Sequence, residues 1–313
     1  MTSGYIALRE HAAWLDLSAR GKIRVSGEDR ARLLHAMTTN QVELLKPGQG
    51  CYAFFLNAQG RILGDVNLLC FEDHFLLDTE PETRPKLFEH LDRYIIADDV
   101  TIEDETDRVA TIAVEGPEAG AVLAQAGAPI PDSLYGSAGW GEWVITRISA
   151  RAGATGFDQF FIFAGASERN ALLAKLPIPA ATPEDARIVR IENGRPRYGE
   201  EITERYLVQE TGQLQAVSFS KGCYLGQEIV ERVRSRAQIH RVLRRLEIDA
   251  VEPPAPGTKL TSGDVDAAEI ASAVFSPGFG KVVALGYVRS QFAEPGTKLM
   301  AGAAQATVFD LHA

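Results

Sequence analysis

A change in the sequence pattern near Arg241 constrains the fold most. Up to that point, apolar runs of strand length alternate with amphipathic segments of helical length. Beyond it, short β-like runs are separated by Pro- and Gly-rich turns, and Pro256-Gly-Thr-Lys-Leu260 recurs as Pro295-Gly-Thr-Lys-Leu299. Two copies do not make a solenoid, but they indicate two equivalent corners of turn and strand. The pattern predicts an α+β region over residues 1–240 and a small C-terminal β-barrel over residues 241–313.

Local sequence signals in the α+β region predict helix starts and one hairpin. Thr182-Pro-Glu-Asp185 combines an N-cap threonine, a proline at the first helical position and an acid at the third. We expect this helix to end at Gly194. Ser26-Gly-Glu-Asp29 is a second start of the capping-box type. Asn57-Ala-Gln-Gly60 separates two apolar runs and predicts a β-hairpin.

Charge and cysteine content limit the classes of partner. The formal net charge of -10 opposes a general affinity for nucleic acid or an anionic membrane. Charged residues interrupt the N-terminal segment where a signal peptide needs its apolar core, and no apolar run approaches the length of a membrane span. Cys51, Cys70 and Cys223 are too scattered for a paired-cysteine metal site and too few for a disulfide framework. We expect a cytoplasmic protein, or one of the mitochondrial matrix if the chain is eukaryotic, without a membrane partner or direct nucleic-acid binding.

The densest candidate site is Phe219–Glu228, which reads FSKGCYLGQE and precedes an expected helix. Lys221 and the helix N-terminus would both favour the thiolate form of Cys223, and so its reactivity. The alternative is that Cys223 is a small buried apolar residue in a glycine-rich turn. The residues alone favour that alternative slightly.

A second cluster runs from Arg190 to Glu200. Glu192 falls in the last turn of the expected helix, where its carboxylate would accept two N–H bonds from a planar aminopyrimidine such as a pterin ring. Arg197 and Tyr198 would then contact the rest of that ligand. The alternative is a surface salt bridge between Arg190 and Glu192 or a neighbour, and without further context it is the better explanation.

Arginines concentrate between the second cluster and the barrel. The alternation of Arg232, Arg234 and Arg236 would place three guanidiniums on one face of an extended segment. In an acidic chain this indicates an anionic partner, such as a polyglutamate tail, a phosphate or RNA. A solvated strand face explains the pattern equally well.

Asp65 stands inside an otherwise apolar run, Gly60-Arg-Ile-Leu-Gly-Asp65-Val. A charged group is expensive to bury there without a partner. It would therefore either hydrogen-bond a nitrogen of a ligand or point to solvent from an exposed strand face.

These clusters together carry a family resemblance. Lys221-Gly-Cys-Tyr-x-Gly-Gln-Glu228 resembles the signature of the YgfZ family of folate-binding proteins, relatives of the glycine-cleavage T-protein, an aminomethyltransferase. Residues 38–65 resemble the N-terminal pattern of that family, and Arg190–Gly199 resembles its middle pattern. The Gly/Pro-punctuated end resembles its C-terminal barrel.

The resemblance implies an aminomethyltransferase-like fold with three domains in a ring around a folate cavity. Two of the domains would be interleaved, as about 1–48 plus 140–240 and as 49–139. The implied ligand is tetrahydrofolate, or a one-carbon or polyglutamylated derivative of it, with Glu192 on the pterin and Asp65 at a folate nitrogen. The residues expected to bind the cofactor are Asp65, Asn57, Arg190, Glu192, Tyr198, Lys221, Tyr224, Gln227, Glu228 and Arg232.

The resemblance also implies a role in assembling or repairing the iron–sulfur clusters of client enzymes, including tRNA-modifying ones. Cys223 would be the functional thiol, and iron–sulfur proteins or assembly factors would be transient partners. Three scattered cysteines do not provide a four-thiolate cluster site, so no resident metal is expected. The alternative function is a folate-dependent aminomethyltransferase or demethylase, with Asp65 as the catalytic carboxylate.

Overall fold

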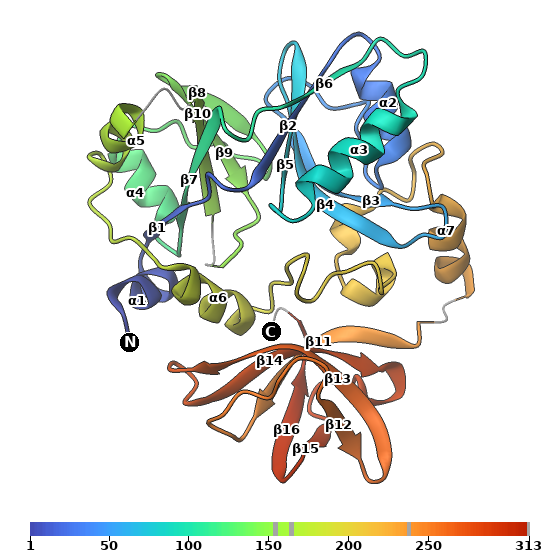
Figure 1. The fold of residues 1–313 in the computed structure, drawn as a ribbon. Coiled ribbons are helices and arrows are strands. Elements are labelled where there is room, and N and C mark those ends of the chain that lie inside the picture. The colour runs from blue at the N-terminus through green and yellow to red at the C-terminus, as the bar shows by residue number, and fades with distance from the viewer. Residues whose placement is uncertain (153–155, 163–165, 237–238, 312–313) are drawn as a thin grey trace.

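The computed structural model of the protein describes residues 1–152, 156–162, 166–236 and 239–311. In this described part, two five-stranded sheets lie beside each other and a closed six-stranded barrel lies below them (Figure 1). The expected α+β architecture and the C-terminal barrel are thereby confirmed. The barrel begins at Arg241, where the change in sequence pattern placed it.

The first sheet has the strand order β3-β4-β5-β2-β6 and is antiparallel throughout. Its elements are β2 (Gly21–Ser26), α2 (Arg30–Met37), β3 (Gly50–Leu56), β4 (Ile62–Cys70), β5 (His74–Thr79), α3 (Arg84–Tyr94) and β6 (Thr101–Asp104). Strands β3 and β4 form the predicted hairpin, and its turn uses a positive φ of 70° at Gly60. Apolar residues of the strands and of both helices form one core, to which α2 contributes Leu34 and α3 contributes Leu87.

The second sheet has the order β1-β7-β10-β9-β8 and is also antiparallel. Its elements are β1 (Ala13–Asp16), β7 (Val109–Glu115), α4 (Ala119–Gln125), β8 (Ser137–Trp140), β9 (Trp143–Ile148), β10 (Gly156–Ile162) and α5 (Ala166–Leu173). The apolar residues from 157 to 163 also predict a strand in the sequence, and β10 covers them up to Ile162; residue 163 lies outside the described residues.

The chain starts in the second sheet, builds the whole first sheet and then returns. Strand β2 pairs with β5 and β6, whereas β7 pairs with β1 and β10. By sheet membership, the first unit therefore spans residues 21–104, and the chain passes into the second unit at 105–108. The sequence-based boundaries at 48/49 and 139/140 differ from this division, because backbone pairing of β2 and β7 leaves little trace in a single sequence.

Helices α1 (Ser3–Glu10) and α6 (Pro183–Glu192) pack against each other below β1 (Figure 1). The predicted capping box of α6 is present: Asp185 N donates to Thr182 Oγ1 at 3.1 Å, and Thr182 N donates to Asp185 Oδ2 at 2.9 Å. The helix ends as expected before Gly194, which has a φ of 64°. The second predicted capping box is wrong, since the Asp29 carboxylate accepts from Asp99 N at 2.9 Å and makes no cap bond to α2.

Residues 195–226 form an irregular segment with two short 3₁₀ turns, Val208–Thr211 and Leu214–Ala216, and lead into α7 (Gln227–Arg236). Its apolar residues Ile202, Val208 and Tyr224 pack on Phe54 and Ile62 of the β3–β4 hairpin. This segment therefore attaches to the first sheet.

The barrel consists of β11 (Arg241–Ile248), β12 (Lys259–Ser262), β13 (Val265–Ser276), β14 (Lys281–Arg289), β15 (Lys298–Ala301) and β16 (Ala304–Phe309), with a 3₁₀ turn at Ser290–Phe292. The two repeated segments are equivalent corners, as predicted. Thr258 N donates to Ala255 O and Thr297 N donates to Glu294 O, each at 3.1 Å. The strands that follow, β12 and β15, pair with each other.

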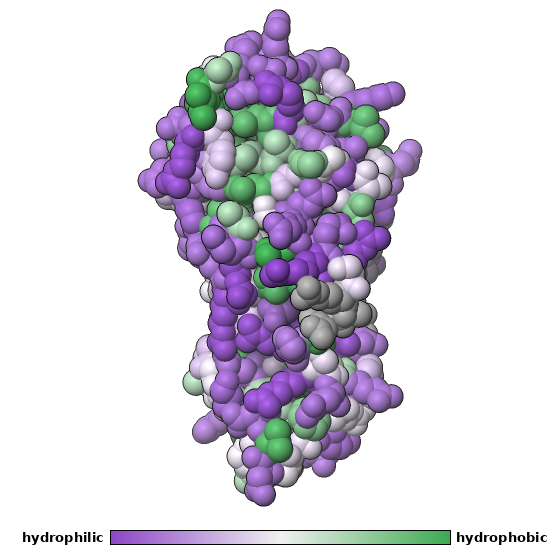
Figure 2. Space-filling view, turned by 90° about the vertical axis from the view of Figure 1, so that its right-hand side faces the viewer, coloured by the Kyte–Doolittle hydropathy of each residue, from purple (hydrophilic) through white to green (hydrophobic). Residues whose placement is uncertain are grey.

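A view from the side shows an upper lobe, made by the two sheet units, and a lower lobe, made by the barrel (Figure 2). A narrower waist joins the lobes. The visible face is mainly hydrophilic, and its apolar residues gather most in the upper lobe.

Candidate functional site

A cavity of about 680 Å³ lies where the two sheet units meet the chain around α6. The first sheet contributes residues of β3 and β4 and the turn after β5, and the second contributes β1 and the loop at 149–152. Much of the remaining wall comes from α6 and residues 195–215. In the described part of the chain, every residue that lines this cavity precedes residue 216, so the barrel does not form part of its wall.

Asp65 lies on this wall, in β4, and is 9% exposed. Its Oδ2 accepts a hydrogen bond from the Tyr52 hydroxyl at 2.7 Å, across the β3–β4 pair. Burial, and then the charge of Glu80, raise the pKa of Asp65 to about 6, against the lowering effect of the Tyr52 hydrogen bond. A carboxyl group that titrates near neutral pH is able to take up or release a proton in a binding site.

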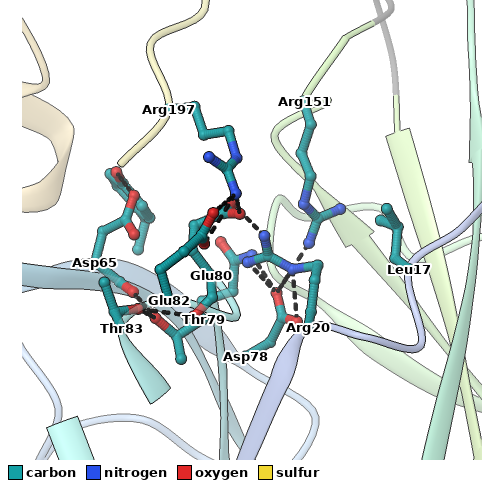
Figure 3. A network of polar contacts seen from close by, with 12 residues as sticks. Leu17, Arg20, Asp65, Asp78, Thr79, Glu80, Glu82, Thr83, Arg151 and Arg197 are labelled. Carbon is teal, nitrogen blue, oxygen red and sulfur yellow. Dashed lines mark hydrogen bonds and ion pairs between the residues drawn. The ribbon is translucent and has the colours of Figure 1, made fainter. Parts of the chain in front are cut away.

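A second carboxylate ties the two sheets together beside the cavity (Figure 3). Asp78, at the end of β5, is completely buried. Its oxygens lie 2.9 Å from Arg20 Nε and 2.9 Å from Arg151 Nη2. Burial acts to raise the pKa of Asp78, but the charges of Arg20 and Arg151 hold it well below its usual value.

A third carboxylate, Glu80, forms an ion pair with the segment that follows α6. It pairs with Arg20 and with Arg197, whose Nη2 lies 2.8 Å from Glu80 Oε2 (Figure 3). Burial would raise the pKa of Glu80, but the two guanidiniums keep it below the usual value. The cavity wall is thus held by an ion-pair network that connects both sheets with residues 195–215.

The structure brings only two of the predicted cofactor residues, Asp65 and Arg190, to the cavity. Arg190 is buried and forms ion pairs with Glu201 at 2.8 Å and with Glu200 at 3.0 Å. Its guanidinium is therefore occupied by protein carboxylates. Arg190 shapes the wall and positions the segment beyond α6.

Glu192, the residue expected at the pterin, does not line this cavity. Its carboxylate is 3% exposed and faces α1 and the barrel. It accepts from the Tyr5 hydroxyl at 2.7 Å and from the Ser276 hydroxyl, and it lies 3.4 Å from Arg9 Nε. The alternative, a salt bridge of Arg190 with Glu192 or a neighbour, is right in part: Arg190 pairs with Glu200 and Glu201 of the same cluster, but it is buried and not at the surface.

None of the residues of the Cys223 motif lines the cavity. Cys223 itself is exposed, so the interpretation as a small buried residue is wrong. The Lys221 ammonium donates to the carbonyl oxygens of Thr38 at 2.6 Å and Asn40 at 2.9 Å, and also to that of His35. Lys221 therefore closes the C-terminal end of α2, and burial lowers its pKa to about 8. Its ammonium is engaged by backbone carbonyls and not by the thiol.

The remaining residues of this motif have structural contacts. Tyr224 packs in the apolar cluster under the hairpin, and the Lys221 ammonium lies 4.9 Å from its ring centre. Gln227 Oε1 accepts from Tyr224 N at 3.4 Å at the start of α7. Glu228 is exposed on the same helix.

Asn57 and Tyr198 also serve the fold. Asn57 Oδ1 accepts from Gln59 N at 2.9 Å and from Arg61 N at 3.0 Å, which shapes the hairpin turn. The buried Tyr198 hydroxyl donates to Ile62 O at 3.3 Å and accepts from Lys86 Nζ at 3.1 Å.

The expected extended face of arginines is not present. Residues 227–236 form α7, so Arg232 and Arg234 are two positions apart on a helix and point in different directions. Both side chains are exposed. The side chain of Arg236 lies outside the described residues.

Sequence reasoning missed most of the cavity wall. Tyr52 and Asn67 pair across the hairpin next to the pair formed by Phe54 and Asp65, so Tyr52, Asp65 and Asn67 share one face. The signal was present, since Asp65 and Asn67 are two residues apart in an apolar run. Arg20, Tyr135 and Arg151 had no comparable signal, because long-range folding alone brings them to the cavity.

Two searches of the described residues add no further site. Among residues 1–152, 156–162, 166–236 and 239–311, no group of three or more His, Cys, Asp and Glu side chains is placed to hold a metal ion. In the same ranges, each helix is too short or too polar to cross a membrane.

Two family models match the sequence and together span nearly all of it. The GCVT N-terminal domain matches residues 2–221, and the glycine cleavage T-protein C-terminal barrel domain matches residues 241–310. The boundary between the two matches coincides with the start of the barrel.

Individual proteins show similarity over the same length. The chain is 30% identical to a chloroplastic transferase of Arabidopsis thaliana whose name marks the assignment as provisional, over 92% of this chain and 68% of that protein. It is 30% identical to an aminomethyltransferase of Deinococcus deserti, over 98% of this chain and 82% of that protein. The crystal structure of the glycine cleavage system aminomethyltransferase T from Bartonella henselae has the same fold, with a TM-score of 0.86 at 24% identity, over 98% of this chain and 87% of that one.

Proposed function

The chain belongs to the glycine cleavage T-protein family, and from this premise we propose that it binds a tetrahydrofolate derivative in the cavity between its two sheets. The cavity volume of about 680 Å³ lies in the range of small-molecule sites. Trp14, Tyr52 and Tyr135 supply aromatic surface to its wall, and Asp65 supplies a charge.

One observation carries this proposal: Asp65 is a buried carboxyl group that faces a cavity and titrates near pH 6. An ionised carboxylate accepts hydrogen bonds from ligand N–H groups more strongly than a neutral acceptor does. Tyr52 holds the carboxylate in one orientation. Asp65 would therefore bind a nitrogen of the folate or stabilise a positive charge that develops on it.

Calorimetric titration with tetrahydrofolate tests the proposal. We expect the affinity of Asp65→Asn to be about tenfold to a hundredfold lower, because a hydrogen bond to a charged group contributes about 1.5–3 kcal/mol. The wild-type affinity should fall as the pH drops through about 6, where Asp65 becomes protonated, and the affinity of the variant should lack this step.

Glu228→Gln is the matched control, because Glu228 is an exposed carboxylate outside the cavity. It should bind tetrahydrofolate like the wild type. Absence of binding by the wild-type protein, or equal binding by wild type and Asp65→Asn, would contradict the proposal.

We further propose that the folate-loaded protein supports iron–sulfur enzymes in the cytoplasm, as the YgfZ branch of the family does, with Cys223 as the functional thiol. The supporting observation is exposure: Cys51 and Cys70 are buried, whereas Cys223 is exposed in the loop before α7. A thiol in that position is accessible to a partner protein. Cys223 does not line the cavity, so in this proposal the thiol and the folate act at separate places.

Complementation separates the two sites. In cells that lack the gene, Cys223→Ser should fail to restore the activity of iron–sulfur enzymes, while the purified variant binds tetrahydrofolate normally. Cys70→Ser serves as a control for the loss of a thiol elsewhere. Full activity of client enzymes with Cys223→Ser would contradict a role for this thiol.

A second candidate function is transfer of an aminomethyl or methyl group to folate, with Asp65 as the catalytic carboxylate. It is favoured by the perturbed titration of Asp65 and by relatives that are named aminomethyltransferases. Incubation with tetrahydrofolate and an aminomethyl donor should then yield methylene-tetrahydrofolate, and Asp65→Asn should yield none. Absence of turnover by a wild-type protein that binds folate would leave the supporting role as the function.

A further inference from the structure

Seven arginines line the cavity, and in the described part of the chain one of them has no carboxylate partner. The paired ones are Arg20, Arg151, Arg169, Arg187, Arg190 and Arg197. Arg195 is the exception. The only side-chain acceptor of its guanidinium among the described residues is Ser149 Oγ, at 3.1 Å from Nη1.

The position of Arg195 is fixed firmly by its backbone. Its N–H donates to Arg190 O at 3.0 Å, and its carbonyl oxygen accepts from Arg190 Nη1 at 2.7 Å. The Nε atom is buried and has no hydrogen-bond partner among the described residues. A half-buried guanidinium with unused N–H donors loses hydrogen bonds to water that the protein does not replace. A planar oxyanion such as a carboxylate is the group that best pairs with the parallel N–H donors of a guanidinium.

Tyr135 stands in the same wall in an unusual conformation. Its φ is 60°, the only positive value at a residue other than glycine in the described part. It is 8% exposed, and its N–H donates to Arg147 O at 2.6 Å. Its hydroxyl makes no hydrogen bond to another described residue. Left-handed backbone at a bulky residue is costly and is found mainly at binding and catalytic sites.

Tyr135 packs closely against the first sheet at Gly50, where the absence of a side chain leaves room for it. A Cβ atom on Gly50 would lie 2.5 Å from Leu68 O and 3.2 Å from Tyr135 Cβ, so only glycine at this position allows the present packing. Burial raises the pKa of Tyr135, the charge of Asp65 adds to the rise, and the charge of Arg195 opposes it. The phenol therefore lies within electrostatic reach of both charged groups.

We propose that Arg195, with the Tyr135 hydroxyl as an additional donor, forms a carboxylate-binding subsite in the same cavity as Asp65. The cavity then has two complementary groups: Asp65 binds a nitrogen of the ligand and Arg195 binds a carboxylate. This inference builds on the proposed function and deepens it. The carboxylate belongs either to the glutamate of the folate or to a small amino acid bound beside it.

Titrations with three probes distinguish the sources. The probes are tetrahydrofolate, the amide of tetrahydropteroate, which lacks the glutamate and carries no carboxylate, and glycine as the smallest amino acid. Arg195→Gln keeps a neutral hydrogen-bond donor on a shorter side chain and removes the charge. If the folate glutamate is bound, this variant should lose about tenfold to a hundredfold in affinity for tetrahydrofolate and none for the amide of tetrahydropteroate. If a small amino acid is bound, only the affinity for glycine should fall.

Two further variants sharpen the test. Tyr135→Phe should show the same selective loss as Arg195→Gln but a smaller one, because it removes a single neutral donor. Arg169→Gln removes a lining arginine that already pairs with Asp16 at 3.1 Å, and it should show no selective loss. Thermal unfolding of each variant confirms that it is folded.

An equal loss of affinity for both folates, or no loss of affinity for any probe, would overturn the subsite. Arg195 would then have only a structural role in the cavity wall. Failure of the proposed function is a separate result. If the wild-type protein binds neither folate, the folate proposal fails. The existence of the subsite is then decided by one comparison, the affinity of wild type and of Arg195→Gln for glycine.

Discussion

The surroundings of Asp65 disfavour its charged form, and this has a consequence for stability. Its pKa rises from 3.8 to about 6 on folding, so the folded protein binds this proton more tightly than the unfolded chain does. The contribution of this group to the free energy of unfolding is fully present below the pKa of the unfolded chain and is lost as the pH rises through about 6. At neutral pH the group therefore works against folding.

Asp65→Asn should accordingly stabilise the protein. The asparagine oxygen still accepts from Tyr52, while the buried charge is removed. A shift of about two pKa units corresponds to ~2–3 kcal/mol of unfolding free energy at pH 8, and to about half of that at pH 5. Urea unfolding of wild type and variant at both pH values measures this difference. A variant less stable than wild type at pH 8 would contradict the description of Asp65 as a buried, charged group.

Glu192→Gln should affect stability and not ligand affinity. The carboxylate accepts from two hydroxyl groups and pairs with Arg9, so it connects α6 with α1 and the barrel. Removing its charge leaves Arg9 without this partner, and we expect a loss of about 1–3 kcal/mol. Unfolding experiments measure the loss, and tetrahydrofolate titration should give the wild-type affinity. A folded variant with strongly weakened binding would show that Glu192 reaches the ligand after all.

At the residue scale, the sequence identified groups that are unusual in their local context. Asp65 was recognisable because a charged group in an apolar strand is costly to bury without a partner. Glu192 was equally recognisable, but its partners Tyr5 and Ser276 are far away in the chain, so its structural role was hidden. Arg195 was overlooked because its distinction is the absence of a partner, and only the packed structure shows this.

At the scale of elements, the end of α6 sets the position of the cavity wall. Gly194 has a φ of 64°, and a Cβ atom there would lie 1.3 Å from Leu311 O, at the end of the barrel. The chain therefore turns out of the helix directly against the barrel. Arg195 and Arg197 follow within three residues, so this turn also aims them at the cavity.

Gly194→Ala should be strongly destabilising. Both the backbone conformation and the contact with Leu311 oppose a side chain, and we expect a loss of more than about 3 kcal/mol of unfolding free energy, in the range of overpacked buried sites. Gly302→Ala is the matched control, with a φ of 62° and no atom within 4 Å of the added Cβ. It should cost only about 1 kcal/mol, for the backbone strain alone. Similar losses for the two variants in thermal unfolding would refute the close contact.

Local signals predicted elements well where the signal is itself local. The capping box of α6 needs only Thr182 and Asp185, and the barrel corners need only a repeated turn. The box at residues 26–29 failed because Asp99, a distant residue, takes the Asp29 carboxylate. The alternating arginines before the barrel suggested a strand, but apolar Val230 is buried against the hairpin and a helix forms instead.

At the scale of the whole molecule, the barrel supports the cavity from outside. Tyr287 of β14 donates to Glu201 O at 2.9 Å, and Arg245 of β11 donates to Glu192 O at 3.2 Å. These contacts hold α6 and the segment after it against the two sheets. The sequence indicated a separate barrel, but it did not indicate which part of the chain the barrel supports, because those contacts join residues far apart in the chain.

The joint between the two sheets depends on Asp78, which belongs to the first sheet and pairs with Arg151 of the second (Figure 3). Arg20 pairs with it at the start of the first sheet. The pKa of Asp78 is lowered by folding, so its contribution to stability is present above the unfolded pKa and is lost as the pH falls toward the folded one. The joint should therefore be insensitive to pH near neutrality and weaken in acid.

Asp78→Asn should destabilise the whole molecule. It removes the charge that the buried Arg20 and the half-buried Arg151 share, a change that costs about 3–5 kcal/mol. Asp73→Asn is the control, because its side chain is 71% exposed in its pair with Arg24, and such a pair contributes at most about 1 kcal/mol. In urea unfolding, the gap between wild type and Asp78→Asn should stay constant from pH 8 to about pH 5 and narrow at lower pH. A gap no larger than that of the control, or one that grows in acid, would show that the sheets are joined by packing and not by this charge.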